Sequence, residues 1–264
     1  MDTRVKLIYL LRRNLFSVQL STVLRRVSPQ EYLVQKGRTR LCIEGYPRSG
    51  NTFAALMFHK ANDAHLGHHT HCTGQIARAL RYGIPVVVPI RNPVDAITSS
   101  VFALGNGDVD SEVYRYLAFY RWVEPRIDSV VLAPFEIIIT DFNQVIKRVN
   151  EKYRTEFNYV EDLEDATKQI RRYFDDLFDN QDEEGGRLKW VPAVVRDFLP
   201  GFLFSMEEQR DSALRWKPIP VSEREKGKQE LVPLVSGHRH IDQAQALYDR
   251  LVDRVRLNFC MNPD

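Results

Sequence analysis

The sequence lacks several features that would place it in a familiar class. It has no uninterrupted apolar run of about 18 residues, so we expect no transmembrane helix. The formal net charge is only +2, which leaves no global positive field for nucleic acid. The three cysteines, Cys42, Cys72 and Cys260, show neither disulfide nor metal-ligand spacing, as is typical of a reducing compartment. We therefore predict a cytoplasmic protein that does not bind nucleic acid.

The length and composition suit one globular domain. A chain of 264 residues, 44% hydrophobic and 27% charged, can bury a sizeable core, and we expect a single domain over residues 1–264. Residues 1–38 are basic, and the pattern over 3–26 predicts an amphipathic helix. Two interpretations of this helix stay open: it packs on the domain, or it makes peripheral contact with an anionic membrane surface.

Strand-like and helix-like segments alternate along the chain. The runs 40–45 and 84–90 are apolar throughout, which is typical of central strands that are covered on both faces. The alternation predicts an α/β fold with a central parallel β-sheet flanked by helices. Further strands are expected at 66–71 and 129–139, helices at 51–62, 73–82, 93–104, 111–127, 141–153, 163–179 and 241–257, and a loop at 218–240.

Residues 45–52, Gly-Tyr-Pro-Arg-Ser-Gly-Asn-Thr, have the spacing of the nucleotide-binding loop G-x-x-x-x-G-K-[ST] but lack its lysine. We call these residues the phosphate loop. A strand-like run precedes them and a helix-like run follows, so backbone N–H groups and the positive helix end point at an anion. Asn51 stands in the place of the lysine, and Arg48 offers a cation from the other side of the turn. Without the lysine, the anion is not expected to be the β,γ-phosphate of ATP.

A second anion site is predicted where the strand 84–90 ends. Arg91 follows the strand, Asn92 is placed to cap the next helix, and Pro93 to begin it. In a nucleotide kinase, such a strand usually ends in an aspartate that holds Mg²⁺. An arginine suits a second phosphate instead. Ser99, two helical turns further on, would add a hydroxyl donor.

Together the two motifs resemble those of sulfotransferases that use 3′-phosphoadenosine-5′-phosphosulfate (PAPS). Residues 47–53 resemble the family's 5′-phosphosulfate loop, P-[KR]-S-G-[TSN]-[TS]-[WF], and residues 91–99 resemble its 3′-phosphate motif, R-[ND]-P-x-D-x-x-x-S. They occur in the family's order, each at a predicted strand-to-helix junction. The resemblance covers residues 40–140. It implies the P-loop-like sulfotransferase fold and transfer of a sulfuryl group to a hydroxyl or amine without a metal, giving adenosine 3′,5′-bisphosphate (PAP).

The resemblance also implies which residues bind PAPS. The amides of residues 48–53 and the hydroxyls of Ser49 and Thr52 would hold the 5′-phosphosulfate, and Phe53 would lie against the adenine. Arg91 and Ser99 would hold the 3′-phosphate. The family's late R-K-G motif is matched only in part, since Glu225 precedes Lys226 and Arg224 lies one step earlier. The expected nucleotide-binding residues are Arg48, Ser49, Gly50, Asn51, Thr52, Phe53, Arg91, Ser99, Arg224, Lys226 and Gly227.

The general base is expected among the histidines of residues 67–72, Gly-His-His-Thr-His-Cys. The family often carries Lys-Thr-His here, so His71 is the first candidate. His69 would replace the lysine, and it stays open as an alternative base. A histidine can accept a proton near neutral pH, and Arg48 would stabilise charge on the leaving group. No further zinc ligands stand at a suitable spacing, so we expect no metal. The expected catalytic residues are His71, His69 and Arg48.

Two other functions remain open at this stage. A phosphotransferase built on the same loop would bind ATP with Mg²⁺, and an inactive protein of the same fold would bind nucleotide without turnover. The acceptor is expected to be a small molecule, a lipid or a glycan. Residues 155–215 predict a helical insert on the acceptor side, either a lid or a solvated helix. The sequence leaves the oligomeric state undecided.

Overall fold

Four short parallel strands form the central sheet. These are β1 (Leu41–Ile43), β2 (Leu66–His68), β3 (Val86–Ile90) and β4 (Val131–Pro134), in the order β2-β1-β3-β4. Cys42 pairs with Gly67 on one side and with Val86 on the other, and Val88 pairs with Leu132. The computed structural model describes residues 32–104, 108–179 and 221–260. The predicted parallel sheet is confirmed.

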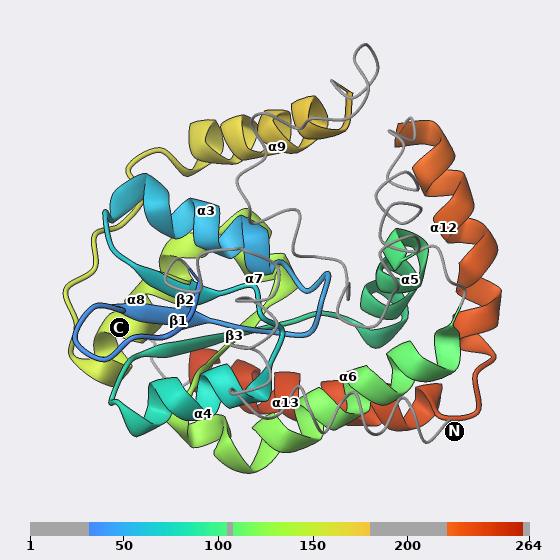
Figure 1. The fold of residues 1–264 in the computed structure, drawn as a ribbon, viewed down its shortest axis with the longest axis horizontal. Coiled ribbons are helices and arrows are strands. Elements are labelled where there is room, and N and C mark those ends of the chain that lie inside the picture. The colour runs from blue at the N-terminus through green and yellow to red at the C-terminus, as the bar shows by residue number, and fades with distance from the viewer. Residues whose placement is uncertain (1–31, 105–107, 180–220, 261–264) are drawn as a thin grey trace, which may run out of the picture.

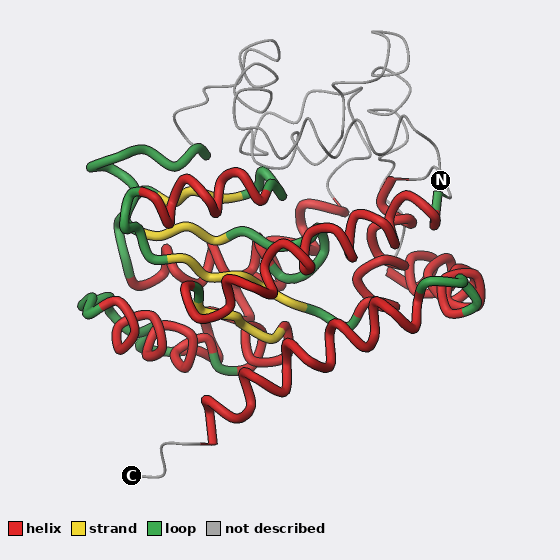
Figure 2. Tube along the Cα trace, turned by 90° about the horizontal axis from the view of Figure 1, so that it is seen from below, coloured by secondary structure: helices red, strands yellow, loops and turns green. Residues whose placement is uncertain are grey.

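Helices cover both faces of the sheet (Figures 1 and 2). The described helices are α3 (Asn51–Ala61), α4 (Thr73–Arg81), α5 (Pro93–Leu104), α6 (Val109–Val123), α7 (Phe135–Thr140), α8 (Phe142–Tyr153), α9 (Leu163–Asp179), α12 (Val221–Ser236) and α13 (Ile241–Cys260), with a 3₁₀ helix, η1 (Glu124–Ser129). Side chains of a strand alternate between the two faces of a sheet. Along β1, Leu41 and Ile43 therefore pack toward α3 and α8, whereas Cys42 packs toward α4, α6 and α13. The predicted α/β class is therefore confirmed.

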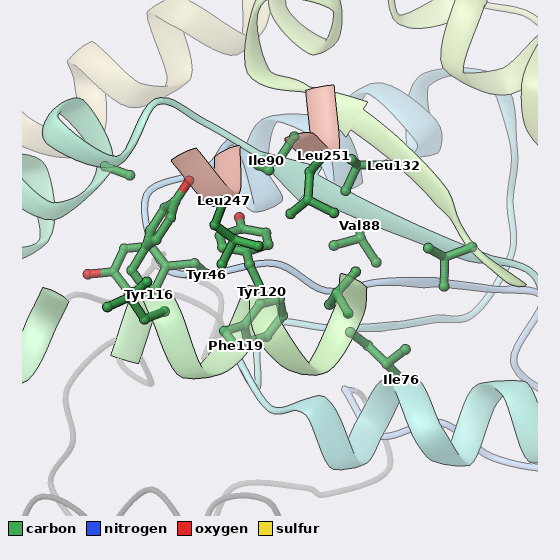
Figure 3. Close-up of a cluster of buried hydrophobic side chains, with 14 of the residues drawn as sticks. Tyr46, Ile76, Val88, Ile90, Tyr116, Phe119, Tyr120, Leu132, Leu247 and Leu251 are labelled. Atoms are coloured by element: carbon green, nitrogen blue, oxygen red, sulfur yellow. The ribbon is translucent and has the colours of Figure 1, made fainter. Parts of the chain in front are cut away.

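Tyr46 of the phosphate loop forms a buried cluster with Tyr116 and Tyr120 of α6 (Figure 3). The ring centroids of Tyr46 and Tyr116 are 5.2 Å apart, and those of Tyr116 and Tyr120 are 4.6 Å apart. The Tyr46 hydroxyl donates to the buried carboxylate of Glu112 at 2.5 Å, and Glu112 also accepts from Ser100 and forms an ion pair with Arg115. The aromatic stripe of α6 is thus core packing, and it fixes the second residue of the phosphate loop to that core.

The start of α5 forms as its sequence predicts. The side-chain oxygen of Asn92 accepts a hydrogen bond from the backbone N–H of Val94 at 3.0 Å, so Asn92 caps the helix and Pro93 begins it. This helix carries Ser99, which it places on the side of the phosphate loop. The local capping signal therefore positions one of the candidate anion ligands.

Three predicted elements are wrong in extent or in type. The strand expected at 66–71 ends at His68, so His69 and His71 lie beyond it. The strand expected at 129–139 ends at Pro134, and the isoleucines that follow belong to α7; an apolar run of this length cannot be assigned by periodicity alone. Of the loop expected at 218–240, residues 221–236 form the helix α12 instead. Its Gly227 lies against Phe102 of α5, where a Cβ would come within 2.5 Å of the Phe102 ring, so the glycine permits close helix packing. None of the described helices is long and apolar enough to cross a membrane.

Two segments were distinguished in the sequence, the basic region 1–38 and the insert 155–215, and both lie largely outside the described residues. Of residues 1–38, only 32–38 are described, so the predicted helix over 3–26 stays a prediction. Of the insert 155–215, the structure describes residues up to 179. There, α9 forms the predicted helix and packs beside α3 (Figure 1).

Candidate functional site

The phosphate loop and Arg91 lie at the same edge of the sheet. The chain passes from β1 through α3 to β2, and returns through α4 to β3 on the other side of β1. The strand order therefore reverses between β1 and β3. Open α/β sheets bind ligands outside the carboxyl ends of the strands at such a point. Gly45 follows β1 closely and Arg91 follows β3, so the two candidate anion sites flank this position.

Two glycines allow the phosphate loop its path. A Cβ on Gly45 would come within 2.6 Å of the carbonyl oxygen of Pro89, so only glycine lets the loop pass this close to β3. Gly50 precedes α3 with a φ of 95°, in the left-handed region that favours glycine. The first turn of α3 carries no acidic residue, and Gly50 has no side chain to cap it. The N–H groups of this turn are accordingly suited to an anion.

Arg91, at the end of β3, reaches the phosphate loop at Arg48, which follows β1. Arg48 Nε donates to Ser99 Oγ at 3.0 Å, and Arg91 Nη1 donates to the carbonyl oxygen of Arg48 at 3.3 Å. The Arg91 guanidinium lies over the ring of Phe135, 4.2 Å from its centroid. Burial lowers the pKa of Arg91, and the carboxylate of Asp95 works in the opposite direction. Two half-buried cations on adjoining loops suit a ligand with two anionic groups.

The two candidate bases differ in what their rings contact. His71 Nδ1 lies 2.9 Å from the carbonyl oxygen of Gly45. A carbonyl can only accept, so Nδ1 carries the proton and Nε2 of the neutral ring carries the lone pair. His69 is engaged on both sides, since Nε2 lies 2.9 Å from Thr52 Oγ1 and Nδ1 contacts His68. Burial lowers the pKa of His69 well below its usual value, which makes this ring a poor base.

A buried glutamate that the sequence reasoning missed adjoins the histidines. Glu44 follows β1, is 0% exposed, and accepts hydrogen bonds from residues 70 and 71. Burial raises the pKa of Glu44 to about 7, while its hydrogen bonds to Thr70, His71 and Gln75 lower it. The available signal was a charged residue at the end of an apolar strand, because such a residue is rarely buried without a set of partners.

Two side chains of the expected nucleotide site point elsewhere. The Ser49 hydroxyl is buried and lies 3.2 Å from the Tyr120 hydroxyl, beneath the loop, which differs from the expectation that it faces the phosphosulfate. Phe53 is 8% exposed and packs in the core between the sheet and α3, which differs from the expected place against adenine. Phe135 is instead the aromatic residue beside the loop, with its ring carbon 3.1 Å from a Cβ built on Gly50.

The remaining loop side chains are also held within the protein. The amide nitrogen of Asn51 donates to the carbonyl oxygen of Tyr46 at 2.9 Å, so this side chain braces the loop from below. The hydroxyl of Thr52 is engaged with His69. What the loop offers an anion is therefore mainly backbone N–H groups and the guanidinium of Arg48.

The partly matched late motif lies on α12 rather than on a loop. Gly227 packs on Phe102, one helical turn beyond Ser99 on α5, and Lys226 is exposed. The backbone of the motif therefore lies against α5. The side chain of Arg224 lies outside the residues whose side chains the structure describes. Phosphate binding by these three residues stays a prediction.

Within the described residues, no three histidine, cysteine, aspartate or glutamate side chains gather as a metal site would require. No protein-family model and no curated protein matches the chain. Among solved structures, the chain is similar to mouse sulfotransferase SULT7A1 complexed with PAP, with a TM-score of 0.36 and 13% sequence identity, over 76% of this chain and 91% of that chain. The residues of this chain form an α/β protein with a phosphate loop that lacks the lysine and with a second cation, Arg91, between β3 and α5.

Proposed function

We propose that the protein is a sulfotransferase that transfers the sulfuryl group of PAPS to a hydroxyl or amine acceptor. One observation carries this proposal: Arg91, at the end of β3, reaches the carbonyl oxygen of Arg48 in the phosphate loop. The two strand ends thereby form one cationic site. PAPS carries phosphate groups at both the 5′ and the 3′ position of its ribose, which matches a loop of N–H groups beside a separate arginine.

The residues divide between the two ends of the nucleotide. The first turn of α3 and the phosphate loop would hold the 5′-phosphosulfate, with Arg48 beside the bond that breaks. Arg91 and Ser99 would hold the 3′-phosphate. The arginine after β3 also distinguishes this site from a kinase site, where an aspartate at this point would hold Mg²⁺.

The transfer reaction moves one group and one proton. The acceptor oxygen or nitrogen forms a bond to sulfur, the bond from sulfur to the 5′-phosphate oxygen breaks, and the electron pair leaves with PAP. His71 Nε2 would take the acceptor's proton, because its Nδ1–H is committed to Gly45. Negative charge grows on the leaving oxygen, and Arg48, with permanent charge and a forked geometry, would stabilise it.

Calorimetry with PAP and with ATP tests this function. We expect PAP to bind at least about tenfold more tightly than ATP, and we expect EDTA to leave the PAP affinity unchanged, because the site offers cations in place of a metal. A preference for ATP that depends on Mg²⁺ would contradict the sulfotransferase and favour the phosphotransferase. Binding of PAP without transfer of label from [³⁵S]PAPS to small molecules, lipids or glycans would favour the inactive alternative.

A comparison of two phenylalanines tests where the base of the nucleotide lies. We expect Phe135→Ala to weaken PAP binding by about 1–3 kcal/mol, the usual cost of losing an aromatic contact to a base. Phe53→Leu should leave the affinity unchanged and lower the free energy of unfolding by about 1 kcal/mol, because Phe53 packs in the core. Calorimetry and urea unfolding on both variants give the two numbers. A loss of affinity in Phe53→Leu alone would restore Phe53 as the adenine contact.

A further inference from the structure

The turn that carries His71 has an unusual backbone. His69 has a φ of 60° and His71 a φ of 50°, so two residues with side chains lie in the left-handed region within three positions. A non-glycine residue in this region costs free energy, and it persists only where contacts with its surroundings compensate for that cost. Such residues are frequent at functional sites. Something in the structure must therefore stabilise residues 69–71 in this shape.

The carboxylate of Glu44 occupies the inside of this turn. One of its oxygens accepts the backbone N–H and the hydroxyl of Thr70, each at 2.8 Å, and the other accepts the backbone N–H of His71 at 2.8 Å. Successive backbone N–H groups next to left-handed residues form a concave site for an anion. Here the anion is supplied by the protein itself. Because every one of these partners donates, the charged carboxylate satisfies them all.

Glu44 is itself held from two directions. Its backbone N–H donates to the carbonyl oxygen of Val87 at 3.1 Å, which ties it to β3, and Gln75 of α4 also bonds to its carboxylate. Gln75 is fixed in turn, since it donates to the carbonyl oxygen of Tyr32 at 2.8 Å and accepts from the N–H of Val34 at 3.0 Å. The carboxylate thus has a defined position relative to the sheet.

The next residue completes the connection to the base. Gly45, which directly follows Glu44, supplies the carbonyl oxygen that His71 Nδ1 contacts. Glu44 therefore holds the backbone of His71 while its neighbour orients the ring. We propose that Glu44 is a positioning residue of this site, which fixes the place and the tautomer of His71. The inference depends on the proposed function only in naming His71 as the base.

Glu44→Gln is the sharpest test, because it keeps the shape of the side chain. In either orientation, the amide sets an N–H donor against a backbone N–H, of Thr70 or of His71. We expect kcat for sulfuryl transfer to fall about 10- to 100-fold, a range typical of groups that orient a functional histidine. The KM for PAPS and the affinity for PAP should change less than about twofold, because the phosphate loop is not touched. Glu151→Gln, an exposed change on α8, serves as the control.

A second readout needs no turnover. In ¹⁵N NMR of the histidine rings, we expect His71 of the wild-type protein to show the Nδ1–H tautomer, and we expect Glu44→Gln to shift it toward a mixture of tautomers. If the tautomer signal of His71 moves while no acceptor is ever sulfated, the positioning role stands and the proposed function fails.

If a folded Glu44→Gln keeps both the wild-type tautomer signal and the wild-type kcat, the positioning role is wrong. An equal fall in kcat and in PAP affinity would also overturn it, since that would indicate general damage to the fold. Should Glu44→Gln not fold, Glu44→Asp, which retracts the carboxylate but keeps its charge, is measured in the same two ways with the same criteria.

Discussion

Replacing His71 with alanine is expected to lower kcat for sulfuryl transfer by about 10²–10⁴-fold, which is the usual contribution of a general base. PAP should bind with nearly unchanged affinity, because His71 contacts the first residue of the phosphate loop at a carbonyl oxygen, which cannot donate a hydrogen bond to an anion. Steady-state kinetics and calorimetry with PAP check the two expectations.

Two other histidines make this test selective. His59→Ala changes an exposed residue in the last turn of α3, far along the helix from the loop, and should leave kcat unchanged. His69→Ala should cost less in kcat than His71→Ala, because the ring of His69 is committed to Thr52 and His68 and its pKa is lowered by burial. If His69→Ala lowers kcat by about 10²–10⁴-fold and His71→Ala does not, His69 is the base.

The sequence predicts the sheet and most helices because their signals are local. The apolar runs of β1 and β3 are long enough to indicate buried strands, and the Asn92-Pro93 pair indicates a helix start without any knowledge of the partners. α12 was not predicted, because Gly227 and Pro233 are residues that usually interrupt a helix and therefore indicate a loop. Contact with α5 outweighs that local preference: the missing side chain at 227 makes room for Phe102.

The candidate site is predictable to a different degree. Arg48 and Arg91 could be identified from motif spacing, because their places follow from strand ends at one edge of a parallel sheet. The roles of Ser49 and Phe53 could not, because whether a side chain faces the ligand or the core depends on Tyr120 and on α3 packing, which are distant in sequence. The role of Glu44 depends on its hydrogen bonds to a turn 26 residues away, and no local sequence pattern predicts that contact.

The second large effect is expected from Arg91→Ala, which should weaken PAP binding by about 2–3 kcal/mol, roughly 30- to 150-fold, at low salt. Arg91 is the cation at the end of β3, half-buried over Phe135, so its charge is less screened than that of a surface residue. Adenosine 5′-phosphate lacks the 3′-phosphate and should lose little affinity. The wild-type preference for PAP over adenosine 5′-phosphate should therefore nearly vanish in the variant. Calorimetry with both nucleotides at two salt concentrations measures this preference.

Arg126 supplies a matched control for this experiment. Its guanidinium lies 4.1 Å from the centroid of the Trp122 ring, much as Arg91 lies over Phe135, but η1 precedes β4 and so lies at the opposite edge of the sheet. Arg126→Ala removes the same charge and a similar stacking contact, and it should leave the affinity for PAP unchanged. Arg91→Lys keeps the charge but loses the forked set of guanidinium donors, so the affinity of this variant for PAP should lie between those of the wild type and Arg91→Ala. If Arg91→Ala weakens both nucleotides equally, Arg91 acts through the carbonyl oxygen of Arg48 on the phosphate loop, and the assignment of a separate 3′-phosphate site is wrong.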